Sequence, residues 1–256
     1  MRRLVFNKNL IVKNLTEQDI SLIVNELGGV SSDRLSKTIN KIKNGVLIDI
    51  GVYRGASSRL MLDMSIENNN KVYGIDPIPG FNSDNPNYIY VKDDSVLVGK
   101  EWGKGEVDLV FFDSVHAKEQ VLCELFYWWD LIKEGGMAVF HDTSWGGYIH
   151  KPGHDAAGKK TGNSALGYDS YGGINWDTPD KAVEEFFNVT LNTEERDIDV
   201  DEFVTIYEDE FIKVDTNYAL LGMTFVHKKK SSDYKDNVNE WDKIFTKRDI
   251  LLSFFK

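Results

Sequence analysis

The chain has 256 residues, 41% of them hydrophobic, which is enough apolar material for a folded domain with a substantial core. Its 41 acidic residues outnumber its 30 basic residues, and the resulting net charge of −11 disfavours nucleic acid as a partner. The single cysteine, Cys123, excludes an intramolecular disulfide, and no apolar run suits a signal peptide or the ~20 residues of a membrane span. We therefore expect a soluble, cytoplasmic protein without membrane attachment.

The first part of the chain has a helical pattern. Thr16 followed by Asp19 suggests a capped helix start, and apolar residues then recur at helical spacing as far as Ile42, with an interruption at Gly28-Gly29. We predict that residues 1–44 form a helical N-terminal extension.

From Gly45 onward, short apolar runs alternate with amphipathic segments. Strands are predicted over 46–50, 71–76, 87–93, 107–113 and 137–142, and helices over 58–67 and 117–133, the second closed by Gly135-Gly136. Strands that alternate with helices indicate a parallel sheet with right-handed crossovers. We expect one α/β domain over residues 45–230.

The segment 144–179 is rich in Gly, Tyr, Asn, His and Trp and has no periodicity, which is typical of a loop with a function such as covering a site. Its aromatic side chains could stack on a substrate or anchor the loop to the core. A helix over 180–188 and two strands over 203–209 and 218–228, a candidate antiparallel pair, follow. Residues 231–256 are predicted to be a helical tail that packs on the domain or on a partner.

A glycine loop, 49-DIGVYRG-55, joins the first predicted strand to the next helix, where open parallel sheets bind cofactors. In a dinucleotide fingerprint, Asp49 would stand where the first glycine belongs and Gly55 would come one position late. A carboxylate there is unfavourable beside a pyrophosphate but not beside an ammonium group. Asp76, ~20 residues further on, suits the ribose of either NAD or S-adenosylmethionine. Alone, the loop could be a simple tight turn.

Acidic and histidine side chains follow two further strands. Asp113 ends one strand, with His116 three residues later, and His141-Asp142 ends the next. Parallel strands bring these ends to one edge of the sheet, where two carboxylates could bind Mg²⁺ or another divalent cation that activates a substrate hydroxyl, with His116 as the base. The alternative is that Asp113 and Asp142 cap a helix and a turn. His141 could be a ligand, a hydrogen-bond donor to a ligand or a packing residue.

The segments DIGVYRG, GIDP and VDLVFFDSVHAKEQVLCELFYWWDLIKEGGMAVFHDT resemble the class I S-adenosylmethionine-dependent methyltransferases. The similarity covers about residues 45–145 and is greatest to the branch of macrocin-type sugar O-methyltransferases and cephalosporin-hydroxylase-like proteins. It implies a Rossmann-like three-layer α/β sandwich with a mixed, mostly parallel seven-stranded sheet whose last strand is antiparallel. It also implies that S-adenosylmethionine binds Asp49, Gly51 and Gly55 at its methionine end, Asp76 at the ribose, and Asp94 and Ser95 at the adenine.

We therefore expect transfer of a methyl group to a hydroxyl of a small molecule, such as a sugar or glycoside. A divalent cation at Asp113, His141 and Asp142 would assist, and His116 would act as the catalytic base. Three alternatives stay open: a metal-independent methyltransferase, a dinucleotide oxidoreductase, and a non-catalytic protein that binds S-adenosylmethionine or assembles with a partner. Homo-oligomerisation also stays open.

Overall fold

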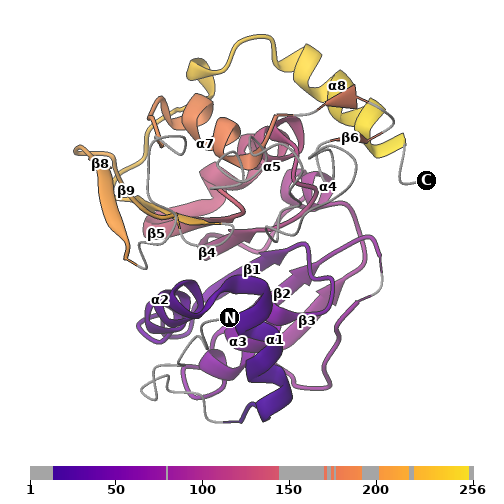
Figure 1. The fold of residues 1–256 in the computed structure, drawn as a ribbon, viewed down its shortest axis with the longest axis vertical. Helices are drawn as coiled ribbons and strands as arrows, with labels where there is room; N and C mark the ends of the chain where they lie inside the picture. The colour runs from indigo at the N-terminus through magenta and orange to yellow at the C-terminus, as the bar shows by residue number, and fades with distance from the viewer. Residues whose placement is uncertain are drawn as a thin grey trace, which may run out of the picture.

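A central eight-stranded sheet organises the computed structural model, which describes residues 14–78, 80–143, 170–171, 174–175, 177–191, 202–218 and 222–253 (Figure 1). The strand order is β3-β2-β1-β4-β5-β10-β9-β8. The strands are β1 (Val46–Ile50), β2 (Lys71–Ile75), β3 (Tyr88–Val91), β4 (Val107–Phe112), β5 (Ile132–His141), β8 (Val204–Glu208), β9 (Ile212–Asn217) and β10 (Met223–Lys228). Strands β1 to β5 are parallel, whereas β10, β9 and β8 pair antiparallel. A separate two-stranded ladder joins β6 (Ser170–Tyr171) and β7 (Ile174–Asn175).

Helices cover both faces of this sheet and make a three-layer sandwich (Figure 1). One face carries α1 (Glu17–Leu27), α2 (Gly29–Ile39) and α3 (Ala56–Ile66); the other carries α4 (Ser95–Lys100), α5 (Lys118–Leu131), α7 (Pro179–Phe187) and α8 (Trp241–Ser253), with a short 3₁₀ helix η1 (Lys235–Asn237) before α8. Alternate strand residues enter the two cores, since Leu47 packs on the α3 side and Ile48 on the α5 side. Within the described part of the chain, no helix has the length and apolar character needed to cross a membrane.

The α/β class and the parallel half of the sheet are as predicted, but the expected number of seven strands is wrong. The missed strand is β9, where Lys213 and Asp215 interrupt the apolar pattern. Strand β9 lies between the two strands that were candidates for a pair, so β8 and β10 do not pair with each other. Helix α4 was also missed, and Gly135-Gly136 lies inside β5 rather than at the end of α5. The predicted lid over 144–179 falls largely outside the described residues.

The turn after β1 brings two strand ends into close contact. The Asp113 amide donates to the Ile50 carbonyl at 3.0 Å, and the Gly51 amide donates to the Ile75 carbonyl at 3.0 Å. Gly51 has φ +85, and a Cβ atom there would lie 2.0 Å from the Asp113 carbonyl oxygen. Glycine is therefore required both by the left-handed backbone and by the approach of β4.

We predict that Gly51→Ala lowers the free energy of unfolding by more than the about 1–3 kcal/mol expected from positive φ alone. Gly105→Ala is the matched control, because Gly105 has φ +89 but nothing within 4 Å of its Cβ position. Urea denaturation of both variants measures the difference. An equal loss in the two would show that the end of β4 moves aside without cost.

Asp49 is fully buried on the α3 side of β1, directly before this turn. The Ser58 hydroxyl donates a hydrogen bond to its carboxylate and lies 3.1 Å from the Tyr88 hydroxyl. Burial raises the pKa of Asp49 from 3.8 to about 7, and the hydrogen bond from Ser58 only partly opposes this. The folded protein therefore retains a proton here at pH values where the unfolded chain releases it.

Because the pKa of Asp49 is higher in the folded state, its contribution to stability is present below pH 4 and is lost as the pH rises toward 7. We predict that ionisation of Asp49 lowers the unfolding free energy of the wild type by up to about 4 kcal/mol as the pH rises from 4 to 8. In Asp49→Asn, the unfolding free energy should depend less steeply on pH. Urea denaturation between pH 4 and pH 8 measures this. If the unfolding free energy changed with pH equally in the two proteins, Asp49 would have the same pKa in the folded and unfolded states.

Candidate active site

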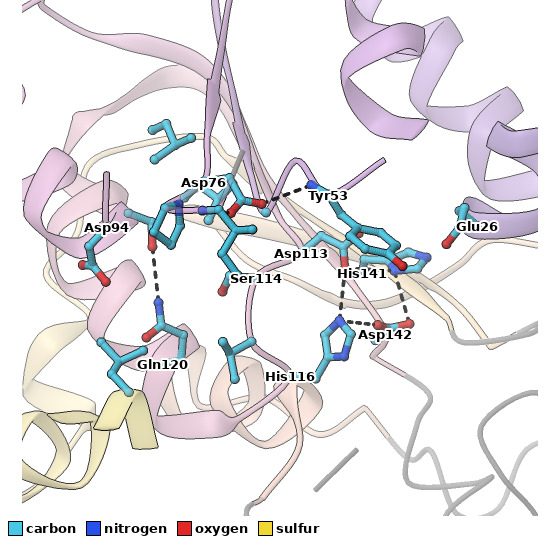
Figure 2. Close-up of a pocket in the computed structure, with 18 residues that line it drawn as sticks. Glu26, Tyr53, Asp76, Asp94, Asp113, Ser114, His116, Gln120, His141 and Asp142 are labelled. Atoms are coloured by element: carbon cyan, nitrogen blue, oxygen red, sulfur yellow. Dashed lines mark hydrogen bonds and ion pairs between the residues drawn. The ribbon is translucent and has the colours of Figure 1, made fainter. Parts of the chain in front are cut away.

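A cavity of about 480 Å³ opens at the carboxyl ends of β1, β2, β4 and β5 (Figure 2). It lies where the strand order reverses between β1 and β4, the place at which open α/β sheets bind ligands. Four predicted cofactor residues line it: Gly51, Asp76, Asp94 and Ser95. Asp49 and Gly55 do not; Asp49 lies below the glycine turn, and Gly55 packs against the Phe81 side chain.

Asp76 faces the glycine loop from the end of β2. Its Oδ2 accepts from the Tyr53 amide at 3.1 Å and its Oδ1 accepts from the Ile78 amide at 2.8 Å. These two bonds hold the carboxylate across the turn, as Figure 2 shows for Tyr53. A carboxylate oxygen can accept further hydrogen bonds, so the ribose role predicted for Asp76 is compatible with this orientation.

Polar side chains line the end of the cavity beside α4 and α5. Asp94 caps α4 by accepting from the amides of Val96 and Leu97 at 3.0 and 3.1 Å. Ser95 Oγ donates to Glu124 at 2.6 Å, and Gln120 Nε2 donates to the same carboxylate oxygen at 2.7 Å. Burial raises the pKa of Glu124 to about 7. Sequence reasoning missed Gln120 and Glu124, although two polar residues four apart inside an apolar helix were a usable signal.

Two carboxylates and two imidazoles meet at the opposite side of the cavity (Figure 2). His116 Nε2 lies 2.8 Å from Asp142 Oδ2 and 3.3 Å from Asp113 Oδ1. His141 Nδ1 lies 3.3 Å from Asp113 Oδ1 and 3.2 Å from Asp142 Oδ1. The structure thus brings together the acidic and histidine residues that were predicted at the ends of β4 and β5.

Charge pairing dominates the ionisation of this cluster. Burial alone would lower the pKa of His116, but the charges of Asp142 and Asp113 outweigh it and raise the pKa to about 10. The same carboxylates raise the pKa of His141 well above its usual value, against the effect of burial. Burial would raise the pKa of Asp142, yet the charges of His141 and His116 hold it well below its usual range. The contacts within the cluster therefore favour the charged forms of His116, His141 and Asp142.

The same cluster has a donor set that fits a divalent cation. One ligand atom each from Asp113, His141 and Asp142 lies within 4.8 Å of the others. Oδ1 of the buried Asp142 lies 3.2 Å from His141 Nδ1 but forms no well-aligned hydrogen bond with the described residues, so it has capacity for a ligand. Carboxylate oxygens suit Mg²⁺ and Mn²⁺, whereas an imidazole nitrogen suits transition metals better than Mg²⁺.

The mouth of the cavity carries residues that sequence reasoning did not select. The Tyr53 side chain is 63% exposed although it lines the cavity, and its ring stacks under the Arg54 guanidinium at 5.1 Å. Glu26 of α1 lies at the same side (Figure 2), 3.8 Å from Arg54. No local motif marks Glu26, because only the packing of α1 against α3 brings it here.

Comparison with known proteins identifies the fold. Residues 48–143 match a family model described as a methyltransferase domain. No curated protein matches the sequence significantly. The methyltransferase PaMTH1 of Podospora anserina, solved with S-adenosylhomocysteine, has a TM-score of 0.52 at 13% identity over 83% of this chain and 87% of its own. A protein from Corynebacterium glutamicum has a TM-score of 0.51 at 13% identity over 85% of this chain and 92% of its own.

The MycE methyltransferase of the mycinamycin biosynthetic pathway, solved with Mg, S-adenosylhomocysteine and mycinamycin VI, has a TM-score of 0.48 at 15% identity. The match covers 83% of this chain and 55% of the MycE chain, so this chain spans about half the length of that protein. The family match extends from β1 to the end of β5 and includes the strand ends around the cavity. Residues 48–143 thus resemble a methyltransferase domain, and the two solved structures with the higher TM-scores share the fold of most of this chain.

Proposed function

We propose that the protein transfers the methyl group of S-adenosylmethionine to a hydroxyl of a small molecule, with a sugar or glycoside as the preferred acceptor class and a divalent cation as an aid. The observation that carries this proposal is the cluster of Asp113, His116, His141 and Asp142 at one side of the cavity. Polar residues that suit a nucleoside line the other side. The two sides together provide for a methyl donor and an acceptor hydroxyl.

In this proposal, the cofactor follows the cavity lining from the glycine turn to α4. Gly51 leaves room for the methionine end, Asp76 accepts hydrogen bonds from the ribose, and Asp94 with Ser95 faces the adenine. Asp49 and Gly55 contribute indirectly, because they lie behind the turn and set its shape. The acidic lining also suits the positive sulfonium of the donor.

His116 is the residue placed to accept the proton of the acceptor hydroxyl. Its imidazole is held by Asp142 and Asp113, and 22% of its side chain is exposed. A base must be neutral before it accepts a proton, and the neighbouring carboxylates favour the charged imidazole. A divalent cation bound by Asp113, His141 and Asp142 would supply positive charge that lowers the pKa of the acceptor hydroxyl and favours neutral His116.

Tyr53 supports a sugar or glycoside as the acceptor. Its exposed ring lies at the mouth beside the cluster, as Figure 2 shows, and flat aromatic faces stack on the apolar faces of sugars. The Glu26 carboxylate lies at the same side and could accept hydrogen bonds from further hydroxyls.

A metal-independent methyltransferase is the second candidate. The observation that favours it is the charge balance within the cluster, where both imidazoles already contact both carboxylates. In that case, Asp142 and Asp113 orient His116, which acts alone.

The predicted division into a 1–44 extension, a 45–230 domain and a 231–256 tail remains part of the proposal. The proposed main partner is the small-molecule acceptor.

Asp142→Asn separates the two candidates. Asp142 has φ +58, a conformation that asparagine also tolerates, so the variant should keep its backbone. We predict that wild type binds Mn²⁺ in a calorimetric or paramagnetic resonance titration, and that Asp142→Asn binds it at least about tenfold more weakly. Affinity for S-adenosylhomocysteine should stay within about twofold.

Asp130→Asn makes the same charge change on the surface of α5, where Asp130 pairs with Lys235, and is the control for this titration. Failure of the wild type to bind Mn²⁺ would leave the metal-independent candidate. Failure to bind S-adenosylhomocysteine would contradict the proposed function itself.

His116→Gln should lower the rate of methyl transfer by about 10²- to 10⁴-fold, because it removes the base. The assay follows release of S-adenosylhomocysteine with a panel of sugars, glycosides and catechols, each with and without Mn²⁺. His227→Gln is the control, since His227 pairs with Asp215 away from the cavity lining. Unchanged turnover in His116→Gln would exclude His116 as the base.

A further inference from the structure

We propose that helix α8 acts as a clamp on the nucleoside end of the cofactor cavity, and that Arg248 of this helix is a positioning residue for cofactor binding. The inference rests on the proposed placement of the cofactor, because it concerns the wall that would face the base. Helix α8 crosses the face formed by α4 and α5 (Figure 1), and its residue Leu252 lines the cavity.

Arg248 is the buried contact between this helix and the cavity wall. Only 6% of the residue is exposed, although it belongs to the last described helix. One guanidinium nitrogen donates to Asp94 Oδ2, and Nε donates to Gln120 Oε1 at 2.9 Å. Asp94 and Gln120 both line the cavity, so a single side chain holds two parts of its wall.

The guanidinium determines how these two side chains are oriented. Asp94 accepts from the amides of α4 with Oδ1 and from Arg248 with Oδ2, so both oxygens are fixed. Because arginine only donates, the oxygen of the Gln120 amide must face α8. Its nitrogen then faces Ser95 Oγ at 3.3 Å and Glu124 at 2.7 Å. The pattern of donors and acceptors offered to a base therefore depends on Arg248.

The same helix also contacts the loop that carries the proposed base. Leu251 is fully buried and packs with Ala117 and the partly buried Val115, which flank His116. Farther from the cavity, Trp241 and Phe245 stack edge-on against Phe126 of α5, with ring centroids 4.7 and 5.4 Å apart. Helix α8 is thus anchored at its start and reaches the cavity with its last turns.

Calorimetric titration with two probes tests this role: S-adenosylhomocysteine and 5′-methylthioadenosine, which shares the nucleoside but lacks the amino-acid end. We expect Arg248→Met to weaken both by the same factor of roughly ten or more, because the shared part of the two ligands is affected. Lys243→Met is the matched control, since the Lys243 side chain on the same helix is 70% exposed and, among the described residues, pairs with Glu240. It should change either affinity by less than about twofold.

Two further variants separate positioning from folding. Arg248→Lys keeps the positive charge but not the planar pair of donors, so it should lose an intermediate amount of affinity for both probes. Arg248→Met leaves the Asp94 carboxylate without its partner. Adding Asp94→Asn removes that charge and should restore the stability of the fold but not the affinity. Urea denaturation of every variant is measured in parallel. A stability loss with unchanged affinity for both probes would overturn the proposal. If the wild type bound neither probe, the proposed function would fail first.

Discussion

The parallel pairing of β1 with β2 and β4 is the constraint on which the rest of the site depends. Backbone hydrogen bonds extend this pairing beyond the strands, from Gly51 to Ile75 and from Asp113 to Ile50. They bring the ends of three strands together, so the side chains that follow each strand must share one edge. The glycine at position 51 permits this approach, because any Cβ there would collide with the end of β4. The cavity is a consequence of that contact.

Charge compensation determines what the cavity can do at each end. At the side proposed for the acceptor, two carboxylates face two imidazoles from neighbouring strand ends, and the contacts favour charged imidazoles and a charged Asp142. At the side proposed for the nucleoside, Asp94 is paired with Arg248, and burial raises the pKa of Glu124 to about 7. The chain carries a net charge of −11, and three carboxylates of the cavity wall, Asp94, Asp113 and Asp142, each have a basic partner. Buried charges are tolerable only when they are paired in this way.

The sequence predicted the structure correctly where an apolar run marks a strand and reactive side chains follow directly after it. Strand β1 was predicted with its observed bounds, and the positions of Asp113 and Asp142 after parallel strands predicted that they would meet. Strand β9 was missed because its pairing with β8 and β10, and not an apolar run, stabilises it. Asp49 was expected at the cavity, but the alternation of β1 directs it toward α3, one layer away. That alternation could have been read from the sequence.

The two ends of the site differ in how far apart their residues lie along the chain. Asp113 and His116 follow β4, and His141 and Asp142 lie at the end of β5, so one strand–helix–strand crossover contains the proposed chemistry. The end proposed for the nucleoside instead joins Asp94 and Gln120 to Arg248 across 154 and 128 residues. No pattern within a segment predicts such a contact, because it depends on how the last helix packs on α5. A match that ends at residue 143 therefore includes the residues proposed to react but omits the helix whose Arg248 contacts the cavity wall.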